Sequence, residues 1–284
     1  MPANVLELVA GEKTEQPSSV QKACLILRAM SDARVTRLTD IASAAGLDKA
    51  TTLRLLDVLA RARFVARDPG TKHYSLGTEL FVLGAAALAR FDPRPTVRPG
   101  LLRLADAFED TVILSVPSGA ESICVDVQEG RFPIRANYLE VGSRRPLGVG
   151  AGSLALLAWL SDREVDAVMP MIASRLGRHP RLTPRVIEKH VADARKRGYA
   201  LMVELVVERM GGIAMPILGG DGRPVAAISI AALTDRISSR EEALAAALKR
   251  EVAACESLWR RAADKDFAPA PQPRKALARA GARR

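Results

Sequence analysis

The sequence contains few of the residues that build disulfide or metal sites. Its three cysteines, Cys24, Cys124 and Cys255, lie far apart among 284 residues and form no CxxC pair. This spacing excludes a disulfide scaffold or a zinc module as the basis of the fold and fits a reducing cytoplasm. No apolar run approaches the ~20 residues that cross a membrane. The N-terminal segment also lacks the basic region and apolar core of a secretory signal. We therefore expect a cytoplasmic protein with no membrane partner and no metal.

Signatures of catalysis are also missing. His179 and His190 belong to no HExxH motif, and no serine stands in a GxSxG turn. The glycine run at residues 148–152 lacks the Lys-Ser/Thr that completes a P-loop, and no strand–GxGxxG–helix unit appears. The sequence therefore predicts neither an enzyme nor a cofactor.

What the sequence has in excess is positive charge. Lys and Arg number 42 against 32 Asp and Glu, a net charge of +10. Genomic base composition alone can produce such an excess, so its distribution along the chain is what matters. Residues 19–77 carry a net charge of +5, whereas residues 78–262 carry only +3. At roughly 150 residues per domain the length predicts two domains, and the first of them is strongly basic.

Residues 18–59 have the spacing of three short amphipathic helices. Ser18 followed by Gln21 is a capping box at the start of the first, Gly46 is a natural end of the second, and Asp48 can cap the third. Apolar positions recur at i, i+3, i+4 and i+7. In the third helix these inward residues are Thr52, Leu55, Leu56 and Leu59. Two such helices joined by a short glycine-containing turn form a helix-turn-helix motif.

The outward face of the third helix is a candidate DNA-reading surface. It carries Lys49, Ala50, Thr51, Leu53 and Arg54. Arg54 can read a guanine, Lys49 and Thr51 can hold phosphates, and Leu53 can contact a thymine methyl. An ordinary solvated helix face is the alternative.

A basic β-hairpin follows the third helix. Phe64–Arg67 and Lys72–Leu76 have the pattern of two short strands around the turn Asp68–Thr71. A basic hairpin directly after a helix-turn-helix is a wing, in which Arg67, Thr71 and Lys72 can touch the DNA backbone or minor groove. Helix-turn-helix and wing together predict a double-stranded DNA operator as the partner.

This region resembles the winged helix-turn-helix of the IclR family of bacterial transcriptional regulators. The resemblance rests on SVQKACLILRAM and LTDIASAAGLDKATTLRLLDVLARARFVARDPGTKHYSLG. The family's third helix usually reads Lys-Ser-Thr, a small residue, a ring, and Arg-Leu-Leu. Lys49, Thr51 and Arg54 match this pattern, whereas Ala50 replaces the serine and Leu53 replaces the ring. The operator therefore cannot be inferred from relatives.

Residues 78–92 are expected to form a linker and dimerisation helix. Thr78–Phe91 is apolar on nearly every side, which is typical of a buried helix, and Pro93 and Pro95 end it. The resembled family has a linker helix here that packs against its copy, which implies a homodimer or a dimer of dimers. Burial against the chain's own second domain is the alternative.

Residues 93–262 are expected to form an α+β domain that resembles the GAF-like effector-binding domain of the same family. The expected helices lie at 97–109, 150–160, 163–172, 185–197 and 239–261. The expected strands lie at 112–116, 122–127, 134–138, 199–204, 212–217 and 225–231. Strands flanked by helices in this order predict an antiparallel sheet covered by helices.

The stretch GSRRPLGVGAGSLALLAWL resembles the family segment that forms one wall of the effector pocket. The resemblance implies that a carboxylate sits at a helix N-terminus built by Gly150, Ala151, Gly152 and Ser153, where backbone N–H groups attract anions. Alternatively, the glycines only allow close packing.

The opposite wall departs from the family pattern for small oxoacids. Met202 stands near the usual acid, Gly212 replaces a Cys or Ser, and the last serine pair is Ser229 and Ala231. Met202 is apolar and flexible, and Gly212 frees space. We therefore expect a larger, less polar organic acid, such as an aromatic carboxylate, with Glu204 a further candidate in the pocket.

Residues 1–18 and the basic tail 263–284 lack a sustained apolar stripe, and we expect both to be disordered. The tail either adds attraction to phosphates or stays solvated without a role. The sequence as a whole predicts a DNA-binding regulator controlled by a small carboxylate-containing metabolite. The rival hypothesis is a small-molecule-binding or enzymatic domain with a basic protein-interaction head.

Overall fold

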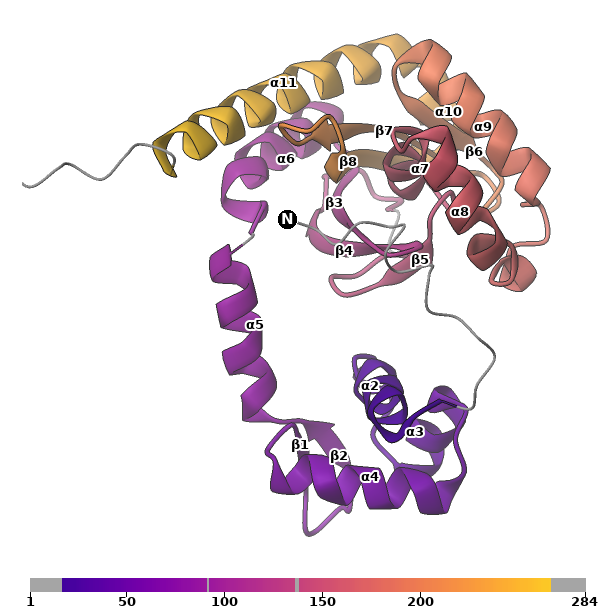
Figure 1. Ribbon diagram of the computed structural model, residues 1–284. Coiled ribbons are helices and arrows are strands. Elements are labelled where there is room, and N and C mark those ends of the chain that lie inside the picture. Colours follow the sequence, from indigo (N-terminus) through magenta and orange to yellow (C-terminus); the bar gives the residue numbers. More distant parts are fainter. Residues whose placement is uncertain (1–16, 91, 136–137, 267–284) are drawn as a thin grey trace, which may run out of the picture.

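A computed structural model describes residues 17–90, 92–135 and 138–266. A small helical unit and a larger sheet domain are joined by the single helix α5 (Thr78–Arg90) (Figure 1). Disorder is predicted for 1–18 and 263–284, of which 1–16 and 267–284 lie outside the described residues. The prediction is wrong for residues 263–266, which continue the last helix, because that helix runs on past the end of the apolar pattern. No described helix is long and apolar enough to span a lipid bilayer.

The small unit has the three predicted helices. Helix α2 (Ser19–Ala29) begins with the predicted capping box, in which the Ser18 hydroxyl accepts from the backbone N–H of Gln21. Helix α3 (Leu38–Ala45) ends at Gly46, whose φ of 66° is the left-handed conformation that glycine tolerates. Helix α4 (Lys49–Arg61) is capped by Asp48, which accepts from the Thr51 N–H at 2.8 Å. The three helices enclose a common core centred on Ile26, Ile41 and Leu56.

The predicted wing is also present. Strands β1 (Val65–Arg67) and β2 (Tyr74–Leu76) pair antiparallel. The Asp68 carboxylate accepts from the N–H groups of Gly70 and Thr71 in the turn, and these bonds lower the pKa of Asp68. The wing is therefore a closed turn held by one aspartate.

Helix α5 is not buried within its own chain. Phe81 is 80% exposed, and Val82 and Leu83 are more than half exposed. The alternative, burial against the chain's own second domain, is therefore wrong for these residues. Pro93 caps and Pro95 opens the next helix, α6 (Arg94–Phe108), because proline fits the first turn of a helix.

The second domain is built on a six-stranded sheet. The strand order is β5-β4-β3-β8-β7-β6, and every neighbouring pair is antiparallel. The strands are β3 (Thr111–Ser118), β4 (Glu121–Gln128), β5 (Arg144–Pro146), β6 (Ala200–Val203), β7 (Met210–Leu218) and β8 (Pro224–Leu233). The α+β prediction is confirmed.

One predicted strand is wrong. The described residues at 134–138 form no strand, and Ile134 is 54% exposed. The free edge of β4 is taken by β5 instead, with Glu121 paired to Pro146. A short apolar run predicts a strand only when a sheet edge is available to pair with it.

Helices cover both faces of the sheet (Figure 1). Helices α7 (Ala151–Ala158), α8 (Asp162–Ala173) and α9 (Pro184–Arg197) share one core with the sheet, and α6 and α11 (Glu241–Asp266) share the other. A 3₁₀ turn, η1 (Leu176–Arg178), and the short helix α10 (Thr234–Ser238) complete the order. The sequence did not predict α10.

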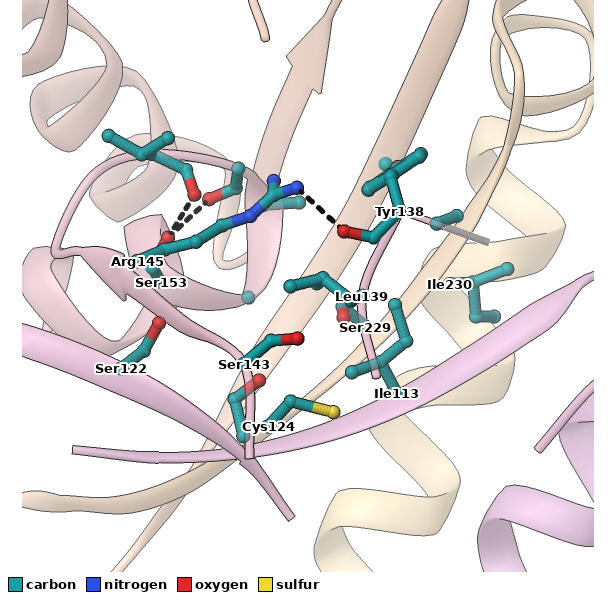
Figure 2. A pocket seen from close by; sticks show the side chains of 17 residues that line it. Ile113, Ser122, Cys124, Tyr138, Leu139, Ser143, Arg145, Ser153, Ser229 and Ile230 are labelled. Atoms are coloured by element: carbon teal, nitrogen blue, oxygen red, sulfur yellow. Dashed lines mark hydrogen bonds between the residues drawn. The ribbon is translucent and has the colours of Figure 1, made fainter. Parts of the chain in front are cut away.

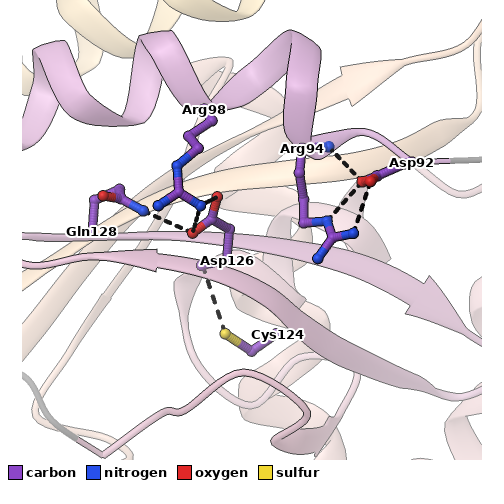
Figure 3. A network of polar contacts seen from close by, with 6 residues as sticks. All are labelled: Asp92, Arg94, Arg98, Cys124, Asp126 and Gln128. Carbon is purple, nitrogen blue, oxygen red and sulfur yellow. Dashed lines mark hydrogen bonds and ion pairs between the residues drawn. The ribbon is translucent and has the colours of Figure 1, made fainter. Parts of the chain in front are cut away.

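A polar network joins α6 to strand β4 of the sheet (Figure 3). The nearly buried Asp126 carboxylate of β4 accepts from Arg98 at 3.2 Å and from the side chain of Gln128 at 2.8 Å. Arg94 binds Asp92 at the junction and lowers the pKa of that carboxyl group. The six-stranded sheet is thereby fastened to the helix that follows α5.

Candidate DNA-binding surface and effector pocket

Helix α4 presents the predicted face. Thr52, Leu55, Leu56 and Leu59 are all buried, and the Thr52 hydroxyl donates to the Asp48 carbonyl at 2.8 Å. The opposite face leaves four of the five predicted reading residues exposed and Thr51 half-buried. The exposed residues are Lys49, Ala50, Leu53 and Arg54. No carboxylate of the described chain forms an ion pair with Arg54.

The wing places its predicted residues differently. The Arg67 guanidinium lies 5.3 Å from the centre of the Tyr74 ring, which leaves its charge exposed. The Thr71 hydroxyl and the Lys72 ammonium instead bond within the turn, to Asp68 at 2.9 Å and to the Pro69 carbonyl at 2.7 Å. Of the three, Arg67 is therefore the one whose polar group is not bonded within the turn.

The sequence analysis missed two residues on the surface at the wing, Arg37 and His73. Arg37, at the start of α3, donates to the His73 ring at 3.3 Å. Both line a shallow surface depression with Arg67 and Lys72. Sequence spacing gives no signal for this pairing, since the two residues are 36 positions apart and meet only when the wing folds back.

A small cavity of about 40 Å³, partly open to solvent, lies between α7 and the sheet (Figure 2). Seven of the eight predicted effector residues line it. These are Gly150, Ala151, Gly152, Ser153, Gly212, Ser229 and Ala231. The eighth, Met202, does not line this cavity. It lines a smaller neighbouring cavity together with Glu204. The Met202 sulfur accepts the N–H of Gly150 at 3.3 Å, behind the helix start.

The start of α7 faces the cavity without a side-chain cap. Its first turn carries no acid, and the first N–H groups of a helix have no partner within the helix. The Ser153 hydroxyl is already used, since it donates to the Val149 and Gly150 carbonyls at 2.5 and 3.1 Å. The donors available to a ligand are therefore the N–H groups of Ala151 and Gly152.

The sheet side of the cavity holds unused hydroxyls. Ser115, Ser122 and Ser229 are each at least 94% buried, yet within the described chain their hydroxyls make no hydrogen bond. Buried polar groups ordinarily have partners. The hydroxyls that line the cavity can therefore bond to water or to a ligand.

The remaining wall is largely apolar. It includes Ile113, Cys124, Tyr138, Leu139 and Ile230. Burial raises the pKa of the Cys124 thiol to about 11 and also raises the pKa of Tyr138. Both groups are therefore neutral at physiological pH. The sequence analysis missed Ser115, Cys124 and Arg145, which strand pairing brings to the cavity, and Tyr138, which lies outside the strands.

Two protein-family models match the chain. The IclR helix-turn-helix domain matches residues 19–69, and the bacterial transcriptional regulator IclR C-terminal model matches residues 85–256. The chain is 28% identical over 225 residues to the HTH-type transcriptional regulator XynR of Escherichia coli, covering 78% of the chain and 89% of XynR. It is 29% identical over 207 residues to the repressor AllR of Salmonella typhimurium, covering 71% and 74%.

Solved structures give the same result. An IclR-type regulator from Silicibacter sp. TM1040 superposes with a TM-score of 0.72 at 26% identity, covering 85% of this chain and 96% of that one. An IclR homologue from Microbacterium hydrocarbonoxydans, complexed with 4-hydroxybenzoate, superposes with a TM-score of 0.69. At 21% identity, over 86% of this chain and 100% of that one, the second likeness shows the fold alone.

Proposed function

The chain belongs to the IclR family of bacterial transcriptional regulators, and from this membership we propose that a small organic acid controls its binding to an operator. The chain is a helix-turn-helix transcriptional regulator. We further propose the division into a DNA-binding head at 19–77, a linker at 78–92 and an effector domain at 93–262.

The observation that carries the DNA-binding surface is the exposed basic face of α4. Arg54 lies on this face without an acid partner in the described chain. A bidentate contact between arginine and guanine contributes about 1–3 kcal/mol of discrimination. Arg37 and Arg67 supply phosphate contacts, which add affinity without sequence information.

The test compares Arg54→Ala with Arg61→Ala, which removes the same charge from the last turn of the same helix. The DNA is an operator fragment selected by the wild-type protein, with random DNA as competitor. Arg54→Ala should reduce the preference for the operator about 5- to 150-fold, whereas Arg61→Ala should weaken both DNAs alike. Retained discrimination in Arg54→Ala would contradict the assignment. Binding of wild type without salt dependence would favour a protein-interaction head.

The pocket supports a carboxylate effector with an apolar body. The N–H groups of Ala151 and Gly152 suit an anion, while Ile113, Tyr138 and Ile230 suit a ring. The homologue that was solved with 4-hydroxybenzoate supports an aromatic acid. Thermal-shift screening should show stabilisation by aromatic acids, and stabilisation by only glyoxylate- or pyruvate-sized acids would contradict an aromatic effector.

The exposed apolar face of α5 supports a homodimer. Phe81, Val82 and Leu83 have no covering element within the described chain, and a second copy of the helix would bury them. Two heads would then bind half-sites about one helical turn apart or a multiple of it. Effector binding that favours one arrangement of the sensors by ~1–3 kcal/mol is enough for a 5- to 150-fold change in DNA affinity.

A further inference from the structure

Arg145 occupies an unusual place at the cavity. It lies on β5, and one guanidinium nitrogen is 3.2 Å from the position that a Cβ on Gly150 would occupy, at the very start of α7. Another guanidinium nitrogen donates to the Tyr138 carbonyl at 3.4 Å, and the group lies 5.0 Å from the centre of that ring (Figure 2). The guanidinium is therefore held at the helix start that the proposed carboxylate would use.

No acid neutralises this guanidinium. The other half-buried arginines of the described chain, Arg94, Arg223, Arg236 and Arg240, each bind a carboxylate. Arg145 forms no ion pair, and it is the only charged residue among those that line the cavity in the described chain.

The groups that face Arg145 do not compensate for its burial. Tyr138 and Cys124 are neutral at physiological pH, and His179 is a further base whose pKa is lowered by its burial and by Arg145 itself. Burial also lowers the pKa of Arg145. A guanidinium removed from water without a counter-charge is costly, so the ligand-free pocket favours an anion.

We propose that Arg145 is the counter-ion that makes this pocket selective for anions, gripping the ligand's carboxylate together with the N–H groups of Ala151 and Gly152. This rests on the proposed effector site. Ser229 lies beside Gly152, and Ser122 is the cross-strand partner of Arg145. Their unused hydroxyls face the same anion. Neutral ligands of the same shape, such as amides, are rejected because they leave the guanidinium without a partner.

The neighbouring Arg144 provides a matched control. It lies on the same strand, carries the same charge and is exposed, with its guanidinium bound to Glu121 at 3.1 Å. Glu121 also binds Arg175 at 3.2 Å, so loss of Arg144 leaves it paired. Arg144→Gln therefore changes the net charge as Arg145→Gln does, without touching the cavity.

The experiment measures dissociation constants of benzoate and benzamide at constant ionic strength by calorimetry, with the full-length wild type, Arg145→Gln and Arg144→Gln. Benzoate should bind wild type and Arg144→Gln equally and Arg145→Gln about 10- to 100-fold more weakly. Benzamide should bind all three weakly and alike. Thermal melts without ligand should show Arg145→Gln at least as stable as wild type, because a purely structural arginine would instead lower the melting temperature.

Equal benzoate affinity in wild type and Arg145→Gln overturns the proposal, as does a matching loss for benzamide or the absence of any benzoate binding. Operator binding with and without benzoate is measured separately. If benzoate binds through Arg145 but leaves operator affinity unchanged, the role of Arg145 as counter-ion is supported and the proposed control of DNA binding by the ligand is wrong.

Discussion

Gly152→Ala distinguishes the two explanations of the glycines at the start of α7. A methyl group at this position would lie 3.1 Å from the Ser229 hydroxyl and 3.7 Å from the Ser115 hydroxyl. It would enter the space between the helix start and the sheet. If that space receives a ligand, the substitution removes binding. If the glycine serves only close packing, the substitution removes stability.

The structure predicts a small effect on folding. Alanine in place of glycine stabilises a helix by roughly 0.5–1 kcal/mol. The tight contact opposes this gain, but the Ser229 hydroxyl has no hydrogen bond to lose and can rotate away. The free energy of unfolding should therefore stay within ~1 kcal/mol of wild type. In Gly152→Ala the added methyl group would keep a ligand anion away from the helix start, so the anion would lose charge-assisted hydrogen bonds. Each such bond contributes about 1.5–3 kcal/mol, or roughly 10- to 100-fold in affinity.

Gly148→Ala is the matched control. Gly148 has a φ of 83°, and a methyl group there would lie 2.7 Å from the fully buried Ile187 side chain. The left-handed backbone costs ~1–2 kcal/mol for alanine, and overpacking adds about 1–3 kcal/mol. Urea unfolding and benzoate titration should show Gly148→Ala destabilised and Gly152→Ala stable but unable to bind. If Gly152→Ala loses as much stability as Gly148→Ala, the close-packing explanation is correct.

Three further predictions concern the side chains of Asp110, Cys124 and Tyr199. Asp110→Asn removes a fully buried carboxylate that binds two arginines and should lower the unfolding free energy by about 3 kcal/mol in urea. Asp106→Asn, from an exposed pair, should change it by less than ~1 kcal/mol. A disulfide reagent at pH 8 should label exposed Cys24 first, and benzoate should slow labelling of Cys124, whose pKa is about 11. Burial and Glu241 raise the pKa of Tyr199 from 10.0 to about 12, so the folded state holds this proton more tightly than the unfolded state does. The free energy of unfolding should therefore fall as the pH rises from 10 to 12. This fall should be smaller in Tyr199→Phe, which has no such proton.

The sequence predicted best where local chemistry decides the structure. The capping box at Ser18, the stop at Gly46 and the cap at Asp48 each stand where the sequence analysis placed them, because each depends on residues within a few positions. The strand expected at 134–138 failed for the opposite reason. Whether such a run becomes a strand depends on which segment pairs with β4, and β5 at Arg144–Pro146 does so.

The same distinction explains the candidate sites. Helical periodicity predicted the α4 face, and Thr52, Leu55 and Leu59 do point inward. Met202 was misplaced because strand pairing turns its sulfur toward the Gly150 N–H, behind the cavity. Arg37 beside His73 has no local signal, since that pair forms only through the tertiary fold.

The net charge of +10 does not by itself tell which arginine and lysine side chains take part in binding. In the described α+β domain, arginine charges such as those of Arg98, Arg236 and Arg240 are offset by buried carboxylates and stabilise the fold. Arg54 on α4 and Arg145 at the cavity have no carboxylate partner in the described chain. The first is exposed where a polyanion can reach it, and the second is half-buried where only a small anion fits. From this difference in exposure we propose that Arg54 meets the operator and that Arg145 meets a small anion.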